Sequence, residues 1–395
     1  MNRPFAITPR DIEEAADRIA GHVLRTPLVA APRLSELIGA EVMVKHENMQ
    51  ATASFKERGA VNKLLLLTED EQRSGVIAMS AGNHAQAVAY HARRFGIPAT
   101  IVMPETTPLV KVENTRKQGA RIVLHGETLY ESTDKAREIA AAERLVLIHP
   151  YDDPAIMAGQ GTVAIEMLAE APDLYVLIIP VGGGGLMAGN AIAARAIRPD
   201  IELIGVEAEL YPSFLNALDG QDRSIGGPTL ADRPVIRGLV ADIVPVSEEL
   251  IERAVNAYTS LHHTLAEGAG AAGLAAILKE PARYAGRKVG LVLCGGNIDT
   301  RLLAGVMVRE LERESRIVSL RLTSDDRPGL LGKVASLLGR EGAKILEVSH
   351  SRRFLDVPAK VVSIEVMIET RGVEHSCAIE EALAQNGFVL LHLKP

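Results

Sequence analysis

Short apolar runs without polar alternation recur between Val76 and Cys294, and stretches with helical spacing separate them. The runs occupy residues 76–79, 99–103, 121–124, 174–181, 202–207 and 288–294. Such runs are typical of strands buried on both faces, and intervening helices are typical of parallel sheets in α/β folds. Because ligands of these sheets bind at the carboxyl ends of the strands, the residues after each run are the first candidates for a functional site.

Near Arg316 the pattern changes to strict alternation. Val318, Leu320 and Leu322 alternate with polar residues, and a turn, a helix, two strands, a second helix and a last strand are predicted to follow. The order βαββαβ is that of a ferredoxin-like module. We therefore predict a larger α/β part at 1–315 and a separate small domain at 316–395.

The composition is that of a globular protein with ample apolar sequence, since 47% of the residues are hydrophobic. A net charge of −7, no long basic run and no Trp argue against nucleic acid as a partner. Two cysteines cannot form a disulfide framework, and no apolar signal segment follows Met1, so we expect a reducing cytoplasm. The most apolar stretch, 176–194, contains Pro180 and five glycines, which predicts strand, loop and helix instead of a membrane span.

The segment TASFKERGA at 52–60 holds the first candidate catalytic residue. Ser54 and Glu57 have the spacing of a capping box, which places Lys56 at the second position of a helix. The positive end of the helix dipole would lower the pKa of this lysine from ~10.4 and favour the neutral, nucleophilic amine. The alternative, which this segment alone favours, is a capped surface helix with a solvated lysine.

The segment SAGNH at 80–84 runs from a predicted strand end to a helix start. Backbone N–H groups there are suited to a carboxylate, and the Asn83 amide is suited to a phenolate oxygen. The alternatives are a helix cap for Asn83 and a packed polar role for His84.

The loop Gly182–Gly185 also follows a predicted strand, and backbone without Cβ atoms at a helix start can wrap a phosphate. An alternative stays open, because Gly183, Gly185 and Ala188 satisfy G-x-G-x-x-A. Glu207 then stands where a dinucleotide fold places its ribose-binding acid.

A third strand end carries LCGGNID at 293–299, in which Cys294 is a candidate to face a pyridine nitrogen. A neutral thiol, with a pKa of about 8.5, would not fully protonate that nitrogen, so prompt loss of a β-leaving group is favoured over a long-lived carbanion. Together with the lysine and the glycine loop, this turn suggests pyridoxal phosphate as cofactor. The alternative is a small buried cysteine on an interior strand.

Six segments occur in the order found in fold-type II (tryptophan synthase β-like) pyridoxal-phosphate enzymes: SFKERGA, SAGNHAQ, GQGT, GGGGL, EGAGA and CGGNID. The chain most resembles threonine ammonia-lyases (threonine dehydratases) of medium length with one C-terminal ACT domain, and the resemblance extends to DDRPGLL at 325–331 and ETRGVEH at 369–375. It implies a catalytic domain at 1–315, with a smaller subdomain at about 52–150 inserted in the larger one, and a regulatory ACT domain at 316–395.

By this resemblance, Lys56 forms the Schiff base with the cofactor and removes the α-proton of the substrate, and Asn83 binds the ring hydroxyl. The other residues implied to hold the cofactor are Phe55, Gly182, Gly183, Gly184, Gly185, Leu186 and Cys294. Those implied to receive the substrate carboxylate are Ser80, Ala81, Gly82, Asn83 and His84. The implied reaction is dehydration and deamination of L-threonine, and more slowly of L-serine, to a 2-oxo acid and ammonia.

Three departures from relatives bear on the chemistry. Serine racemases of the same family carry an acid serine where this chain has Ala81. Their divalent-cation site begins at the position of Glu207, but Ser213 stands where a later carboxylate is needed, so no required metal is expected. Relatives also have a longer segment after Asp232 beside the active site, and its shortening here bears on substrate preference.

ACT domains pair side by side and bind amino acids at their interface. The resemblance therefore implies a homodimer or homotetramer and an effector site, with isoleucine or valine as the natural effector. The residues that lead into the helix N-terminus there are Asp326, Arg327, Pro328 and Gly329. The alternative is a module that only holds subunits together.

Three alternatives to a threonine dehydratase stay open. One is a dehydratase for another β-hydroxy amino acid such as 3-hydroxyaspartate. A nicotinamide-dependent oxidoreductase is motivated by the glycine pattern with Glu207. A non-catalytic amino-acid sensor is motivated by the short segment after Asp232 and the small domain.

Overall fold

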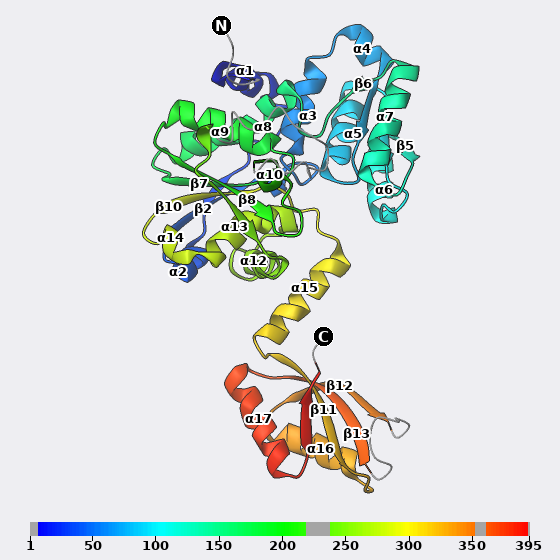
Figure 1. Ribbon diagram of the computed structural model, residues 1–395, viewed down its shortest axis with the longest axis vertical. Helices are drawn as coiled ribbons and strands as arrows, with labels where there is room; N and C mark the ends of the chain where they lie inside the picture. The colour runs from blue at the N-terminus through cyan, green and yellow to red at the C-terminus, as the bar shows by residue number, and fades with distance from the viewer. Residues whose placement is uncertain (1–6, 219–237, 352–360, 394–395) are drawn as a thin grey trace. The chain divides into compact units, whose positions relative to one another are not determined.

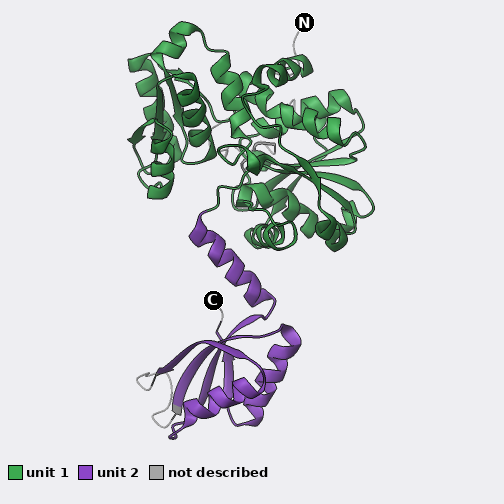
Figure 2. Ribbon diagram, turned by 180° about the vertical axis from the view of Figure 1, so that it is seen from behind, with its two compact units in different colours: residues 1–298 green, residues 299–395 purple. Residues whose placement is uncertain are grey.

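The computed structural model describes residues 7–218, 238–351 and 361–393 (Figure 1). The chain divides into two compact units, Met1–Ile298 and Asp299–Pro395 (Figure 2). Within the described ranges, no helix has both the length and the apolar character needed to cross a bilayer.

A six-stranded sheet forms the larger part of the first unit. Its strand order is β1 (Leu28–Ala30), β2 (Glu41–His46), β10 (Lys288–Leu293), β7 (Val176–Pro180), β8 (Glu202–Ala208) and β9 (Asp242–Val246). All neighbouring strands are parallel except β1, which is antiparallel to β2. The helices of this part are α1 (Pro9–Ile19), α2 (Pro32–Ile38), η1 (Glu47–Met49), α8 (Pro154–Glu170), α9 (Gly185–Ile197), α10 (Ser213–Leu218), α12 (Glu248–Leu261), α13 (Gly268–Lys279) and α14 (Pro281–Tyr284).

A second, four-stranded parallel sheet lies in the same unit, within the chain segment 76–147. Its order is β5 (Arg121–Leu124), β4 (Ala99–Met103), β3 (Val76–Met79) and β6 (Val146–Leu147). The helices α3 (Lys56–Leu65) and α4 (Glu69–Ser74) precede this segment, and α5 (Asn83–Phe95), α6 (Leu109–Lys117) and α7 (Leu129–Glu143) lie within it. The prediction of parallel strands alternating with helices is confirmed in both sheets.

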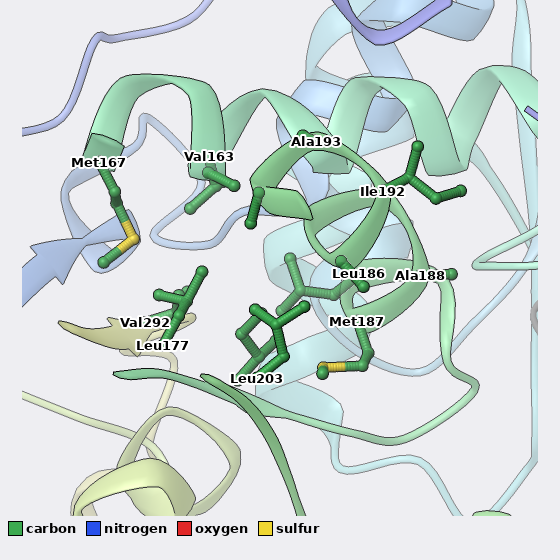
Figure 3. Close-up of a cluster of buried hydrophobic side chains, with 14 of the residues drawn as sticks. Val163, Met167, Leu177, Leu186, Met187, Ala188, Ile192, Ala193, Leu203 and Val292 are labelled. Carbon is green, nitrogen blue, oxygen red and sulfur yellow. The ribbon is translucent and has the colours of Figure 1, made fainter. Parts of the chain in front are cut away.

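Buried apolar side chains from α8 and α9 pack against the larger sheet. Figure 3 shows Met167 of α8, Met187 of α9 and Leu203 of β8 in one core cluster. The two helix backbones touch, because a Cβ atom on Gly189 would lie 2.2 Å from the Met157 carbonyl oxygen. Since α9 begins at Gly185, this contact fixes the tetraglycine loop relative to α8.

The second unit contains α15 (Thr300–Arg313) followed by a βαββαβ module. The module consists of β11 (Ile317–Asp325), α16 (Leu330–Arg340), β12 (Lys344–Ser351), β13 (Val361–Glu369), α17 (Val373–Gln385) and β14 (Val389–His392). Its strands pair antiparallel in the order β12-β13-β11-β14, which confirms the predicted ferredoxin-like module. The compact unit starts at Asp299 and so includes α15, ahead of the boundary at 316 expected from the sequence.

Candidate active site

A cavity of about 430 Å³ lies at the carboxyl ends of β7 and β10. Chain segments that are distant in sequence meet there, as expected for an α/β sheet. Its lining comprises Phe55, Lys56, Asn83, Tyr151, Pro180, Val181, Gly182, Gly183, Gly184, Gly185, Leu186, Val206, Ala208, Glu248, Ile251, Glu267, Gly268, Ala269, Ala272 and Cys294.

The loop before Lys56 is held against the turn after β10. Ser54 and Gly295 form an isolated antiparallel β-bridge. The backbone N–H of Phe55 donates to the Cys294 carbonyl at 3.0 Å. These contacts place Lys56 and Cys294 in the same cavity although 238 positions separate them (294 − 56).

The predicted capping box at the start of α3 is wrong. Lys56 is the first residue of α3 instead of the second, and the N-cap makes no side-chain hydrogen bond. The Glu57 carboxylate instead accepts the Thr52 backbone N–H and contacts His91 Nε2, while the backbone of Ser54 pairs with Gly295.

The Lys56 side chain is half-buried and lines the cavity. Its Nζ donates to the Pro150 carbonyl at 2.7 Å and lies 5.1 Å from the centroid of the Phe55 ring. Burial lowers the pKa of Lys56 to about 8, although Cys294 and Glu267 act in the opposite direction. The expected lowering is therefore present, but desolvation is its main cause instead of the helix dipole.

The glycines after β7 differ in what a side chain would meet at each position. Gly184 has φ +82°, a left-handed conformation that a side chain would strain. At Gly183 a Cβ would lie 2.3 Å from the Tyr151 ring, so that aromatic ring rests on the loop backbone. A Cβ at Gly182 would have no atom within 4 Å. The loop is therefore open beside Gly182 and leads into the N-terminus of α9, a geometry suited to an anion.

Asn83 lies at the first position of α5 and is hydrogen-bonded at both ends of its amide. Its Nδ2 donates to Glu267 Oε1 at 2.6 Å, and its Oδ1 accepts from Asn297 Nδ2 at 2.8 Å. Gly82, and not Asn83, is the N-cap of α5. The helix-cap alternative for Asn83 is therefore wrong.

Of the five residues Ser80–His84, Asn83 belongs to the cavity lining. Ser80 accepts the Gly82 backbone N–H at its hydroxyl, at 3.1 Å. The His84 imidazole is buried and pairs through Nε2 with the Ile148 carbonyl at 2.9 Å. Burial, and then the charge of Lys56, lower the pKa of His84 to about 3, so this ring stays neutral at physiological pH.

Cys294 is a buried and Glu267 a half-buried titratable group, and both line the cavity. Burial raises the pKa of the Cys294 thiol, and Glu267 adds to this shift, so the thiol is neutral near pH 7. Burial also raises the pKa of Glu267, against the hydrogen bond from Asn83. Cys294 is thus both buried and part of the cavity, a combination of the two alternatives that the sequence left open.

The Glu207 carboxylate faces α10. Its Oε1 accepts the Phe214 backbone N–H at 2.7 Å and its Oε2 accepts that of Leu215 at 3.1 Å. The segment after Asp232 falls in 219–237, outside the described residues. In the second unit, Asp326–Gly329 lie between β11 and α16, where Gly329 is the N-cap with φ +83°.

These features fit pyridoxal phosphate. The glycine loop at a helix N-terminus suits its phosphate, the Lys56 amine its aldehyde, the Asn83 amide its ring hydroxyl and the Cys294 thiol its ring nitrogen. In a comparison with family models, residues 19–295 match the model described as "Pyridoxal-phosphate dependent enzyme". The chain belongs to the pyridoxal-phosphate-dependent enzymes. The nicotinamide alternative is therefore wrong, and Glu207 is engaged by the backbone of α10.

Individual relatives agree with this family. The chain is 40% identical over 395 residues to the L-threonine ammonia-lyase of Thermotoga maritima, covering 97% of this chain and 98% of that protein. Maize serine racemase superposes with a TM-score of 0.72 at 32% identity, covering 79% of this chain and 100% of that one. Threonine deaminase isoform 2 of Solanum lycopersicum gives 0.69 at 31% identity, covering 78% and 90%.

Four groups that contact the predicted site residues were not themselves predicted from the sequence. They are the Pro150 carbonyl, the Tyr151 ring, Glu267 and Asn297. Glu267 and Asn297 stand inside quoted segments, EGAGA and CGGNID, and a polar residue beside glycines at a strand or helix end was the available signal. Pro150 and Tyr151 belong to no such pattern, and only their spatial neighbours reveal them.

Proposed function

We propose that the protein converts L-threonine to 2-oxobutanoate and ammonia, with L-serine to pyruvate as a secondary activity. The observation that carries this proposal is the meeting of Lys56, the glycine loop and a neutral Cys294 thiol in one cavity. The relative from Thermotoga maritima, named L-threonine ammonia-lyase, supports the choice of substrate because the match spans 97% of this chain.

Pyridoxal phosphate, when bound, supplies the electron sink that stabilises the carbanion formed at the substrate Cα. Lys56 would anchor the cofactor and then take the α-proton of the substrate. A pKa of about 8 suits an amine that acts as a base. Gly182–Gly185 would hold the phosphate, Asn83 the ring hydroxyl and Phe55 the side of the ring. Ser80–His84 would place the substrate carboxylate, and the proton that Lys56 takes from Cα would be available to the β-hydroxyl, which would leave as water.

The neutral thiol favours elimination over other outcomes. A thiol with a raised pKa would add no charge at the ring nitrogen, so Cys294 would limit the electron sink that the cofactor supplies, which favours elimination. Ala81 carries a methyl group, which cannot deliver a proton to the opposite face of the substrate, so we expect no racemisation. That no divalent metal is required also stays a prediction.

For the second unit we propose an ACT-type regulatory role with an amino-acid effector, isoleucine or valine first, near Asp326, Arg327, Pro328 and Gly329. Its ferredoxin-like strand order supports this assignment. We also propose a homodimer or homotetramer, and the expected cytoplasmic location stays a prediction.

The proposal is tested by a substrate panel on purified protein loaded with pyridoxal phosphate. We expect a visible absorption band that borohydride removes, and 2-oxobutanoate from L-threonine faster than pyruvate from L-serine. A preference for 3-hydroxyaspartate would favour the alternative dehydratase, and no turnover with a retained visible band would favour the sensor. Repeating the panel with isoleucine or valine tests the effector.

Replacement of Cys294 by Asp is expected to change the products and not only the rate. A carboxylate at the ring nitrogen would hold a proton there and lengthen the life of the carbanion, which permits transamination. We expect a larger ratio of transaminated cofactor to 2-oxobutanoate in Cys294→Asp, measured by absorbance and product analysis. Cys294→Ser, which stays neutral, is the matched control, and an unchanged ratio in Cys294→Asp would refute the assigned position of Cys294.

A further inference from the structure

Asn83 belongs to a hydrogen-bond network on the wall of the cavity, together with the Thr52 carbonyl, Asn297 and Glu267. Asn297 Nδ2 donates to the Thr52 carbonyl and to Asn83 Oδ1, both at 2.8 Å. Asn83 Nδ2 then donates to Glu267 Oε1 at 2.6 Å. The Glu267 carboxylate is also hydrogen-bonded by the backbone N–H of Asn297, which closes the network.

The Thr52 carbonyl fixes which groups donate and which accept throughout this hydrogen-bond network. The Thr52 carbonyl can only accept, so the group that Asn297 presents to it must be the NH₂. The same NH₂ also donates to Asn83, so Asn83 must accept with its Oδ1. Its own NH₂ is then directed toward Glu267. An amide nitrogen has two N–H groups, and Glu267 takes one of them.

The tight packing around Glu267 leaves little freedom in this arrangement. A Cβ at Gly295 would lie 2.3 Å from Glu267 Oε1 and 3.1 Å from Asn83 Nδ2. The Glu267 backbone N–H donates to the Gly295 carbonyl at 3.1 Å. The glycine after Cys294 therefore makes room for the carboxylate that holds Asn83.

We propose that Glu267 and Asn297 are positioning residues that fix the Asn83 amide with its second N–H toward the cavity, ready for the ring oxygen of the cofactor. The inference rests on the proposed function for the identity of the ligand. Without Asn297, only Glu267 holds the Asn83 amide in this orientation, and a turned amide would present an oxygen to an anionic ring oxygen.

The test compares Asn297→Asp with Asn297→Ala, with pyridoxal phosphate affinity of the cofactor-free protein as readout. Asp is nearly isosteric but has no side-chain N–H, so it competes with Glu267 for the NH₂ of Asn83 and favours a turned amide with its oxygen toward the cavity. Ala removes the hydrogen bond from residue 297 to Asn83 without favouring the turned amide. We expect Asn297→Asp to bind the cofactor about tenfold more weakly than Asn297→Ala, measured by titration of the visible absorption.

An Asn83→Ala background completes the cycle. If Asn297 acts through Asn83, the difference between Asp and Ala at 297 should disappear there. The inference would be overturned if Asn297→Asp and Asn297→Ala bound the cofactor equally well with Asn83 intact. It would also be overturned if their difference persisted in the Asn83→Ala background. Asn62→Asp is the matched control, because Asn62 Nδ2 also donates to a backbone carbonyl, that of Ala155 at 2.7 Å, away from the cavity lining; it should keep wild-type affinity.

Glu267 gives a second, independent comparison should Asn297→Asp not fold. Gln at 267 can still accept the Asn83 N–H through its carbonyl oxygen, whereas Ala cannot. We expect Glu267→Gln to stay within about threefold of wild-type affinity and Glu267→Ala to lose about tenfold. Equal losses would show that charge, and not position, is what Glu267 supplies. Wild-type protein that binds the cofactor but forms no 2-oxobutanoate would sink the proposed function while these affinities still test the inference.

Discussion

Lys56→Ala is expected to lower the rate of 2-oxobutanoate formation from L-threonine by at least about 10³-fold. The variant loses both the amine that anchors the cofactor and the base that takes the α-proton, and the described residues of the cavity lining include no second lysine. The measurement is the turnover rate with excess pyridoxal phosphate, together with the visible band and its response to borohydride.

The fold of this variant should stay intact, because burial disfavours the charged form of Lys56 and removal of the amine relieves that cost. We therefore expect its thermal midpoint to equal or exceed that of the wild type. Lys63→Ala is the control on the same helix, since Lys63 pairs with Asp153 at 2.7 Å and does not line the cavity. Substantial turnover by folded Lys56→Ala would eliminate the proposed mechanism.

Much of the architecture could be predicted because burial leaves a direct mark on sequence. The runs at 76–79, 99–103 and 121–124 coincide with β3, β4 and β5. The strands β1 and β2 were not predicted, since β1 has three residues and β2 carries Glu41, Lys45 and His46 among its six. Their place in the sheet comes from the pairing of β2 with β10 and of β1 with β2, contacts that no local pattern reports.

The site was predictable where a backbone conformation or a helix start required particular residues, as in the glycine loop. The start of α3 was mispredicted, because the tertiary contacts of Ser54 with Gly295 and of Glu57 with His91 replaced the local cap. The same limit applies to Asn83. Its amide was singled out, but its partners Glu267 and Asn297 lie 184 and 214 positions away.

A buried ionic cluster anchors the helix that carries Lys56. Arg58 donates through Nε and Nη2 to the two oxygens of Glu47, at 2.7 Å each. It also donates to Glu166, at 2.7 and 2.9 Å, and Lys45 donates to Glu166 at 2.6 Å. Two cations and two carboxylates balance in charge, and the side chains of Arg58, Glu47 and Lys45 are fully buried. The cluster joins β2, η1, α3 and α8.

Arg58→Met is accordingly expected to lower the free energy of unfolding by about 3–5 kcal/mol at pH 7, because two carboxylates are left with one lysine in a buried setting. Denaturant unfolding measures this loss. Arg73→Met, which removes a 68% exposed arginine paired with Glu69 and Asp70, is the control and should cost less than ~1 kcal/mol.

The pH dependence of that loss separates the ionic cluster from a packing defect. Burial tends to raise the pKa of Glu47, but the charge and hydrogen bonds of Arg58 outweigh burial and lower it. A lowered folded pKa means that Glu47 stabilises the wild type above its unfolded pKa and loses this contribution as pH falls through the folded value. In Arg58→Met only the Thr26 hydrogen bond and the charge of Lys45 still oppose the effect of burial on Glu47, so this carboxylate takes up a proton more readily and its unpaired charge disappears. The stability gap between the two proteins should therefore narrow from pH 7 to pH 5; a gap that stays constant would mean that lost packing, and not an uncompensated carboxylate, destabilises the variant.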